Sequence, residues 1–301
     1  MARALFHIAK RAWYEDQQRR WPRSEPPSDP LPGEAWFADP LALQIQLKGV
    51  SSPHHEGTSV KIDPDETDLS KAFRPRPFLI VSNEYVLDQK RAWVCPLSTA
   101  AETSASGPLP AWVVPLPEHK TFCLASKLHT IETEFFTDFA DRELLRLKGS
   151  IQDASAVKIR EAILQHLEGA FAPSRDPLPP GTIIRHHDGT ERIVVANCYL
   201  GNLYRGAGTL TTTCRIDRGV EAPDVPAHET LPGIVLLPAP PSPADEKSTP
   251  PAPAGFVDLI DLASENQSRL LNKRVGYEPA LVGAIHTAFR DLLLGESEEG
   301  Q

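Results

Sequence analysis

Proline is concentrated in three segments, and these segments divide the chain before any other feature is considered. The sequence has 301 residues and 30 prolines, and the densest runs are WPRSEPPSDPLPG (21–33), FAPSRDPLPPG (171–181) and LPAPPSPADEKSTPPAPAG (237–255). Proline lacks the backbone N–H and clashes with the preceding helical turn, so such a run is excluded from helix interiors and central strands. We therefore expect a linker after an N-terminal segment, a second linker near the middle, and a loop in the last quarter.

The overall composition is typical of a globular protein. Hydrophobic residues make up 41% and charged residues 24% of the chain, close to ordinary values. No run of about 18 apolar residues is present, so no transmembrane helix is predicted. The four cysteines include no Cys-x-x-Cys pair, and the N-terminus lacks a secretory pattern, which favours a reducing cytoplasm without zinc or disulfides. Because the net charge is −9, any nucleic-acid site has to be a local patch.

Short apolar strands dominate between the linkers, and each half of the chain ends in a helix. Strands are predicted at 78–82, 92–97, 112–116, 122–128, 193–196, 210–216 and 233–237. Apolar residues at helical spacing predict helices over 2–21, 153–167 and 279–294.

The two halves are similar segment by segment. RPFLIVSN (76–83) aligns with ERIVVAN (191–197), and CPLST (95–99) aligns with TLTTT (209–213), at one offset of 114 positions. VVPLP and IVLLP follow in the same order, each ahead of a phenylalanine. This order predicts a duplicated unit of roughly 130 residues. Two unrelated small β domains with similar linkers remain the alternative.

The first half resembles the MazF/PemK/Kid toxins, which share a fold with CcdB. The resemblance rests on five ordered segments, PGEAWFADP (32–40), RPFLIVSN (76–83), VCPLST (94–99), CLASKLHTIE (123–132) and LLRLKGSI (144–151). With the linkers and the repeat, it implies a mainly β chain with terminal helices, of the α+β class. The expected order is an N-terminal helix and linker over 1–30, a Src-homology-3-like barrel of the CcdB/PemK/MazF type over 31–170, and a second, degenerate barrel over 178–296. A C-terminal helix closes each barrel.

The activity that the resemblance implies is sequence-selective cleavage of single-stranded RNA, such as mRNA, without a metal ion or cofactor. The ribose 2′-hydroxyl attacks the adjacent phosphate, leaving a 2′,3′-cyclic phosphate and a free 5′-hydroxyl. Such toxins inhibit growth and are controlled by an antitoxin protein, which is the partner we expect beside the RNA.

Carried onto this sequence, the catalytic arginine of the family falls on Arg76 and its strand-end hydroxyl on Ser98, with Thr99 beside it. A guanidinium can clamp phosphate oxygens. His54 and His55 lie in the connection that overlies the active site of these toxins, where a histidine suits proton transfer; the favoured alternative is that both are ordinary exposed loop histidines. The residues predicted to contact RNA are Arg74, Arg91, Lys127, Arg192, Arg205, Arg215 and Thr212.

The second half has Thr190 at the position aligned with Arg76, so we expect it to lack its own cleavage centre and to form a wall of the RNA groove. A tandem chain can build the two-fold dimer of these toxins within one polypeptide, or it can dimerise through its first half. Two other functions stay open. One is a non-catalytic CcdB-like module that binds gyrase or another protein, and the other is a regulatory protein that retains the toxin fold.

Overall fold

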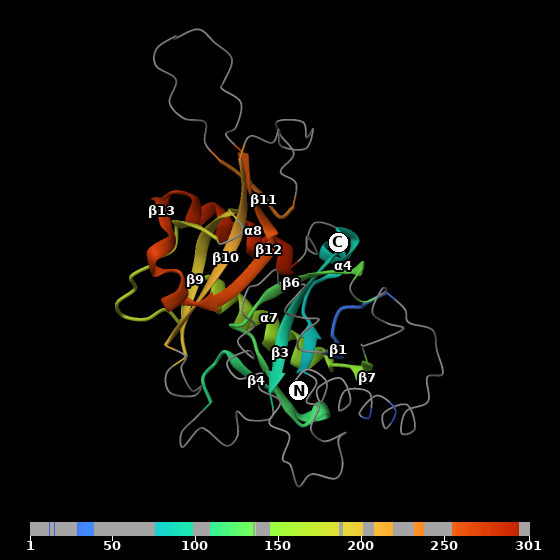
Figure 1. The fold of residues 1–301 in the computed structure, drawn as a ribbon. Helices are drawn as coiled ribbons and strands as arrows, with labels where there is room; N and C mark the ends of the chain where they lie inside the picture. The colour runs from blue at the N-terminus through green and yellow to red at the C-terminus, as the bar shows by residue number, and fades with distance from the viewer. Residues whose placement is uncertain are drawn as a thin grey trace, which may run out of the picture.

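The computed structural model describes residues 29–38, 76–98, 109–134, 136, 145–186, 189–200, 208–218, 232–237 and 255–294, together with Ala12 and Glu15. These last two residues are helical, and the rest of the helix predicted over 2–21 lies outside the described residues. The chain is mainly β, with two antiparallel sheets and a helix after each of them (Figure 1). The predicted class, mainly β with helices that end each half, is therefore confirmed.

The first sheet is built from the first half of the chain. Its elements are β1 (Glu34–Ala38), β2 (Arg76–Ile80), α4 (Glu84–Asp88), β3 (Arg91–Ser98), β4 (Val113–Leu116), η1 (Pro117–His119), β5 (Thr121–Leu124), β6 (His129–Glu132), β7 (Leu145–Ser150) and α7 (Asp153–Leu167). The strand order is β4-β5-β3-β2-β1-β7, and β6 also pairs with β3.

The second sheet repeats this order. Its elements are β8 (Thr182–Arg185), β9 (Glu191–Tyr199), β10 (Thr209–Arg218), β11 (Ile234–Leu236), β12 (Gly255–Asn266), η2 (Gln267–Arg269), η3 (Leu271–Lys273), β13 (Arg274–Tyr277) and α8 (Leu281–Leu294). The strand order is β11-β12-β10-β9-β8-β13. The long β12 pairs with both ends of β10, and so takes the places that β5 and β6 hold in the first sheet. Within the described strands, the first and last strands of each sheet do not pair with each other, so neither sheet forms a closed barrel.

Backbone hydrogen bonds show which residues correspond. The amide of Gly33 donates to the carbonyl of Ile80 (2.9 Å), and the amide of Gly181 donates to that of Val194 (2.8 Å). Both glycines have a positive φ, of 78° and 90°, which glycine adopts at no steric cost.

The strand register corrects the alignment of the hydroxyl-rich segments. Leu79 pairs with Cys95 and Ile193 pairs with Cys214, so Cys95 corresponds to Cys214. TLTTT lies at the start of β10, whereas CPLST reaches the end of β3. The two segments have similar composition but occupy opposite ends of corresponding strands.

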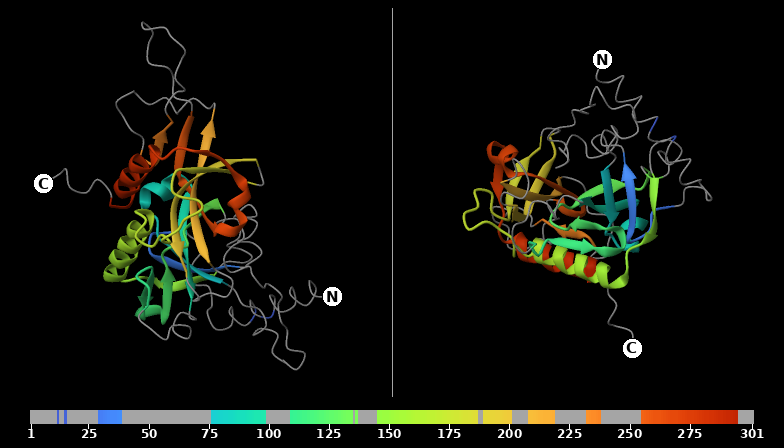
Figure 2. Two further views of the ribbon diagram at one scale, coloured as in Figure 1. Left: turned by 90° about the vertical axis from the view of Figure 1, so that its left-hand side faces the viewer. Right: turned by 90° about the horizontal axis from the view of Figure 1, so that it is seen from below.

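The two halves share their hydrophobic core. The largest cluster combines Trp93 and Ile163 of the first half with Ile193 and Phe289 of the second, among other buried residues. Two smaller clusters also take side chains from both halves. Helices α7 and α8 lie side by side on one side of the molecule (Figure 2). These clusters take side chains from both halves, so neither half has a complete core of its own. Because apolar burial is the main stabilising term in folding, the contact between the halves contributes to the stability of each.

The contact between the sheets is reciprocal. Thr130 of β6 and Ser264 of β12 hold corresponding places in the two sheets. The amide of Leu262 donates to Oγ1 of Thr130 (2.8 Å), and the amide of Leu128 donates to Oγ of Ser264 (3.1 Å). Each half therefore uses the same two positions to contact the other half. The isologous interface of a two-fold dimer has this property.

The four cysteines are buried, with free thiols. No helix among the described residues is long and apolar enough to cross a membrane.

Candidate functional site

The two positions predicted to carry the cleavage chemistry lie at the same end of two neighbouring antiparallel strands. Phe78 of β2 pairs with Pro96 of β3 at the end of their pairing, and Arg76 and Ser98 each lie two residues beyond these paired residues on their own strands. Ser98 is half-buried, ends β3 and pairs with Phe122 of β5. The backbone of Arg76 begins β2, and its side chain lies outside the described part. The strand register therefore brings the two candidate positions to one end of the sheet.

Several predicted site residues lie outside the described residues altogether. They are His54, His55, Arg74, Thr99 and Arg205.

The corresponding place in the second half has different chemistry. Glu191 pairs with Ile216, and one further residue brings Thr190 opposite Asp217. Oδ1 of Asp217 accepts a hydrogen bond from Nε of Arg215 (2.9 Å) and forms an ion pair with its Nη2 (2.8 Å). A threonine and a carboxylate thus stand where the first half has Arg76 and Ser98. Neither position carries the cation that would stabilise negative charge on a phosphate, so this pair of positions is unsuited to the same reaction.

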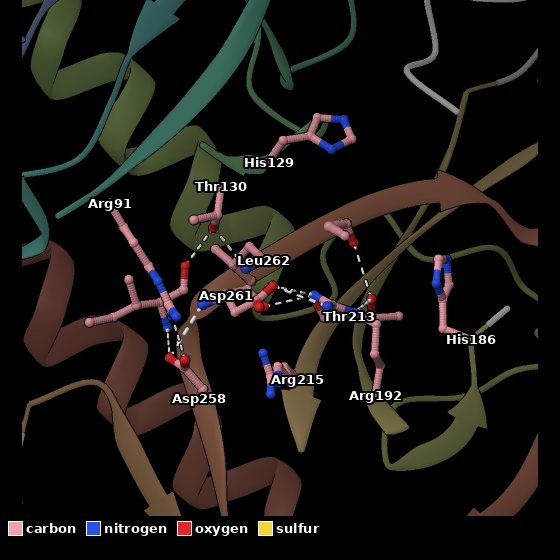
Figure 3. A network of polar contacts seen from close by, with 12 residues as sticks. Arg91, His129, Thr130, His186, Arg192, Thr213, Arg215, Asp258, Asp261 and Leu262 are labelled. Carbon is pink, nitrogen blue, oxygen red and sulfur yellow. Dashed lines mark hydrogen bonds and ion pairs between the residues drawn. The ribbon is translucent and has the colours of Figure 1, made fainter. Parts of the chain in front are cut away.

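A network of polar contacts joins the two sheets (Figure 3). Arg91 of β3 forms an ion pair with Asp258 of β12, and it lies 3.8 Å from a carboxylate oxygen of Glu132. Oδ1 of Asp258 also accepts from the amide of Ile260 (3.0 Å). Arg91 was predicted to contact RNA, but its charge is balanced by carboxylates within the protein.

Arg192 of β9 is an interior residue of this network. Its side chain is only 8% exposed, and Nη1 donates to Oδ1 of Asp261 (3.0 Å). Its Nε donates to Oγ1 of Thr213 (2.9 Å), and its Nη2 donates to the carbonyl of Asp261 (2.7 Å). A buried guanidinium needs such partners, because burial of an unpaired charge is costly. Arg192 therefore holds β9, β10 and β12 together, and is not placed to meet a ligand at the surface.

Lys127 and Thr212, also predicted to contact RNA, are buried. Thr212 Oγ1 lies 2.8 Å from Nε2 of His166 on α7 and 2.9 Å from Oγ of Ser264. Thr212 therefore links α7 to the second sheet, and neither side chain is presented to solvent.

Two buried histidines escaped the sequence analysis. Burial lowers the pKa of both His129 and His166 to about 4. For His129 the neighbouring charges of Lys127 and Arg192 act in the same direction, while Glu265 opposes them. Each histidine has one ring nitrogen, Nε2 of His129 and Nδ1 of His166, without a hydrogen-bond partner among the described residues. Both lie where the halves meet. His129 belongs to the segment CLASKLHTIE, but nothing in that segment indicates that its ring is buried.

A third group lies at the exposed end of the second sheet; of its members, the sequence pointed only to Arg185, as part of a candidate basic face for RNA phosphates. Arg185 and Arg218 both form ion pairs with Glu191. Arg185 and Glu191 pair across the neighbouring strands β8 and β9, whereas Arg218 comes from the more distant end of β10.

No group of three or more histidine, cysteine, aspartate or glutamate side chains is arranged to hold a metal ion within the described part of the chain. In comparisons with known proteins, the sequence matches no family model and no curated protein.

Proposed function

We propose that this chain is a toxin-like endoribonuclease that cleaves single-stranded RNA without a metal ion, with Arg76 and Ser98 at its centre. The observation that supports the proposal is the antiparallel pairing of β2 and β3, in which Phe78 pairs with Pro96, so that the start of β2 and the end of β3 lie at the same end of the two strands. The 2′-oxygen bonds to phosphorus as its proton leaves, and the bond to the 5′-oxygen breaks as that oxygen takes up a proton. The guanidinium of Arg76 stabilises the negative charge that builds up on the phosphate oxygens. Thr99, His54 and His55 are the further candidates for hydrogen bonding and proton transfer.

In this proposal the chain is an internal dimer of two Src-homology-3-like units of the CcdB/PemK/MazF type. The repeated strand order and the reciprocal bonds of Thr130 and Ser264 support it. The second unit lacks a cleavage centre, since Thr190 and Asp217 take the two key positions. It provides a wall of the RNA groove instead. A cognate antitoxin is the protein partner that this reading implies.

The decisive experiment compares the purified protein with its Arg76→Ala variant on a long single-stranded RNA. We expect EDTA-resistant cleavage that leaves 2′,3′-cyclic phosphate and 5′-hydroxyl ends, and at least a 100-fold slower rate for Arg76→Ala, the usual cost of removing one group that stabilises a developing oxyanion. Arg290→Ala is the matched control, because Arg290 is an exposed arginine of α8 paired with Glu168.

Cleavage at an unchanged rate by Arg76→Ala would reject the site. If the wild-type protein leaves RNA intact but arrests growth when expressed, the non-catalytic CcdB-like function replaces the nuclease.

A further inference from the structure

Two exposed arginines of the second half are held side by side by one carboxylate. Arg185 ends β8, Arg218 ends β10, and Glu191 begins β9 between them. Nη2 of Arg185 donates to Oε1 of Glu191 (2.9 Å), and Nε of Arg218 donates to Oε2 (2.7 Å). The side chains of Arg185 and Arg218 are 59% and 49% exposed. We call Arg185 and Arg218 the arginine pair.

The arginine pair lies beside the counterpart of the proposed cleavage site. Arg185 pairs with Glu191, which directly follows Thr190, and Arg218 directly follows Asp217. Thr190 and Asp217 are the positions that correspond to Arg76 and Ser98. The second half therefore has no cation at position 190 itself, but has two on the adjoining strand ends.

The geometry leaves both guanidiniums able to bind an anion. Each guanidinium carries five N–H donors in a planar fork, and the bond to Glu191 uses one donor nitrogen of each. The hydrogen bonds from Arg185 and Arg218 lower the pKa of Glu191, so the carboxylate stays ionised and keeps both forks in place. Among the described residues, two positive charges here face one negative charge, while the adjacent Arg215 is balanced by Asp217.

We propose that Arg185 and Arg218 form a binding site for the phosphodiester backbone of single-stranded RNA. The site deepens the proposed function and rests on it, since it would hold the strand on the second half while cleavage takes place at the first. Arginine suits this role because its planar fork matches two phosphate oxygens.

The test measures the binding of a fluorescent 2′-O-methyl RNA oligonucleotide, which has no 2′-hydroxyl and cannot be cleaved by this chemistry. Fluorescence anisotropy gives the dissociation constant of the wild-type protein, of Arg185→Ala/Arg218→Ala and of the control Arg290→Ala over a range of salt concentrations. Each phosphate contact on a single strand contributes about 0.7 to the slope of log K against log salt. Loss of two contacts should lower the slope by about 1.4 and weaken binding about 25-fold at 0.1 M salt. Arg290→Ala should bind like the wild type.

A second variant separates charge from folding. Arg185→Lys/Arg218→Lys keeps both charges and should restore most of the salt slope, and thermal unfolding checks that each variant is folded. The proposal is overturned if the double alanine variant keeps the wild-type affinity and slope, or if the lysine variant binds as weakly as the alanine variant.

The two proposals fail in different ways. If Arg76→Ala abolishes cleavage while the double alanine variant binds normally, the arginine pair is rejected and the nuclease stands. If no RNA is cleaved but binding depends on the arginine pair, the nuclease is rejected and the RNA-binding site stands.

Discussion

At the residue scale, the surroundings of an arginine decide what it can do. Arg192 is buried against Asp261 and serves the interior, and Arg215 is matched by Asp217 on its own strand. Arg185 and Arg218 share one carboxylate and stay exposed. The same residue type thus has three roles within one sheet, because burial and the number of nearby carboxylates differ.

The buried histidines predict how stability depends on pH. In the folded chain the pKa of His129 and of His166 is about 4, whereas in the unfolded chain it is about 6.5. Above pH 6.5 both residues are neutral in both states, so stability is independent of them. As the pH falls from about 6.5 towards 4, the unfolded chain binds protons that the folded chain does not. The free energy of unfolding therefore decreases, by up to about 3 kcal/mol for each histidine.

Urea unfolding between pH 5 and 7.5 measures this dependence, above the range in which most carboxylates titrate. His166→Gln should give a shallower slope of unfolding free energy against pH. A wild-type stability that is constant over this range would contradict the buried, neutral state of both histidines.

At the scale of elements, local patterns predicted most helices and strands. The apolar stripe over 153–167 predicts α7 with its observed bounds, and the apolar runs at 78–82, 92–97 and 210–216 lie in or overlap β2, β3 and β10. The longest strand, β12, was not predicted. Its sequence, GFVDLIDLASEN, begins directly after a proline-rich run, and it is buried along most of its length by strands from both sheets.

A close approach of β10 and β12 predicts a strong effect at Gly255. Its φ is 137°, and a Cβ there would lie 2.1 Å from the carbonyl oxygen of Asp217. Gly255→Ala must push the two strands apart, and we expect a loss of more than about 3 kcal/mol of unfolding free energy. Gly169→Ala is the control. Gly169 also has a positive φ, of 83°, but a Cβ there would meet no atom within 4 Å, so only the backbone strain of about 1–2 kcal/mol applies.

Chemical denaturation of both variants measures the difference. Equal losses for Gly255→Ala and Gly169→Ala would show that β10 and β12 are not packed this closely.

At the scale of the whole molecule, the two similar halves form one structural body. Three hydrophobic clusters contain side chains of both halves. Asn83, which follows β2, also donates to the carbonyl of Leu292 at the end of α8 (2.6 Å). Side chains of one half thus complete the core of the other half, and Asn83 provides a hydrogen-bond donor for a carbonyl at the end of the other half's helix.

The shared core predicts cooperative unfolding. The full chain should show a single calorimetric transition, with equal calorimetric and van't Hoff enthalpies, because separation of the halves would expose the clusters between them. Two resolved transitions, one for each half, would contradict this expectation.

The sequence alone was sufficient for features that depend on neighbours along the chain. The proline runs mark boundaries, apolar periodicity predicts α7 and several strands, and the Arg-Pro and Ser-Thr segments identify positions 76 and 98 as candidates. Only the tertiary structure decided which strand end corresponds to which, and which polar residues face the interior. CPLST and TLTTT look alike, but register is set by hydrogen bonds to distant strands, so local likeness placed them wrongly. The burial of Lys127, Arg192 and Thr212 likewise arises from contacts between distant segments, and no pattern of near neighbours along the chain carries that information.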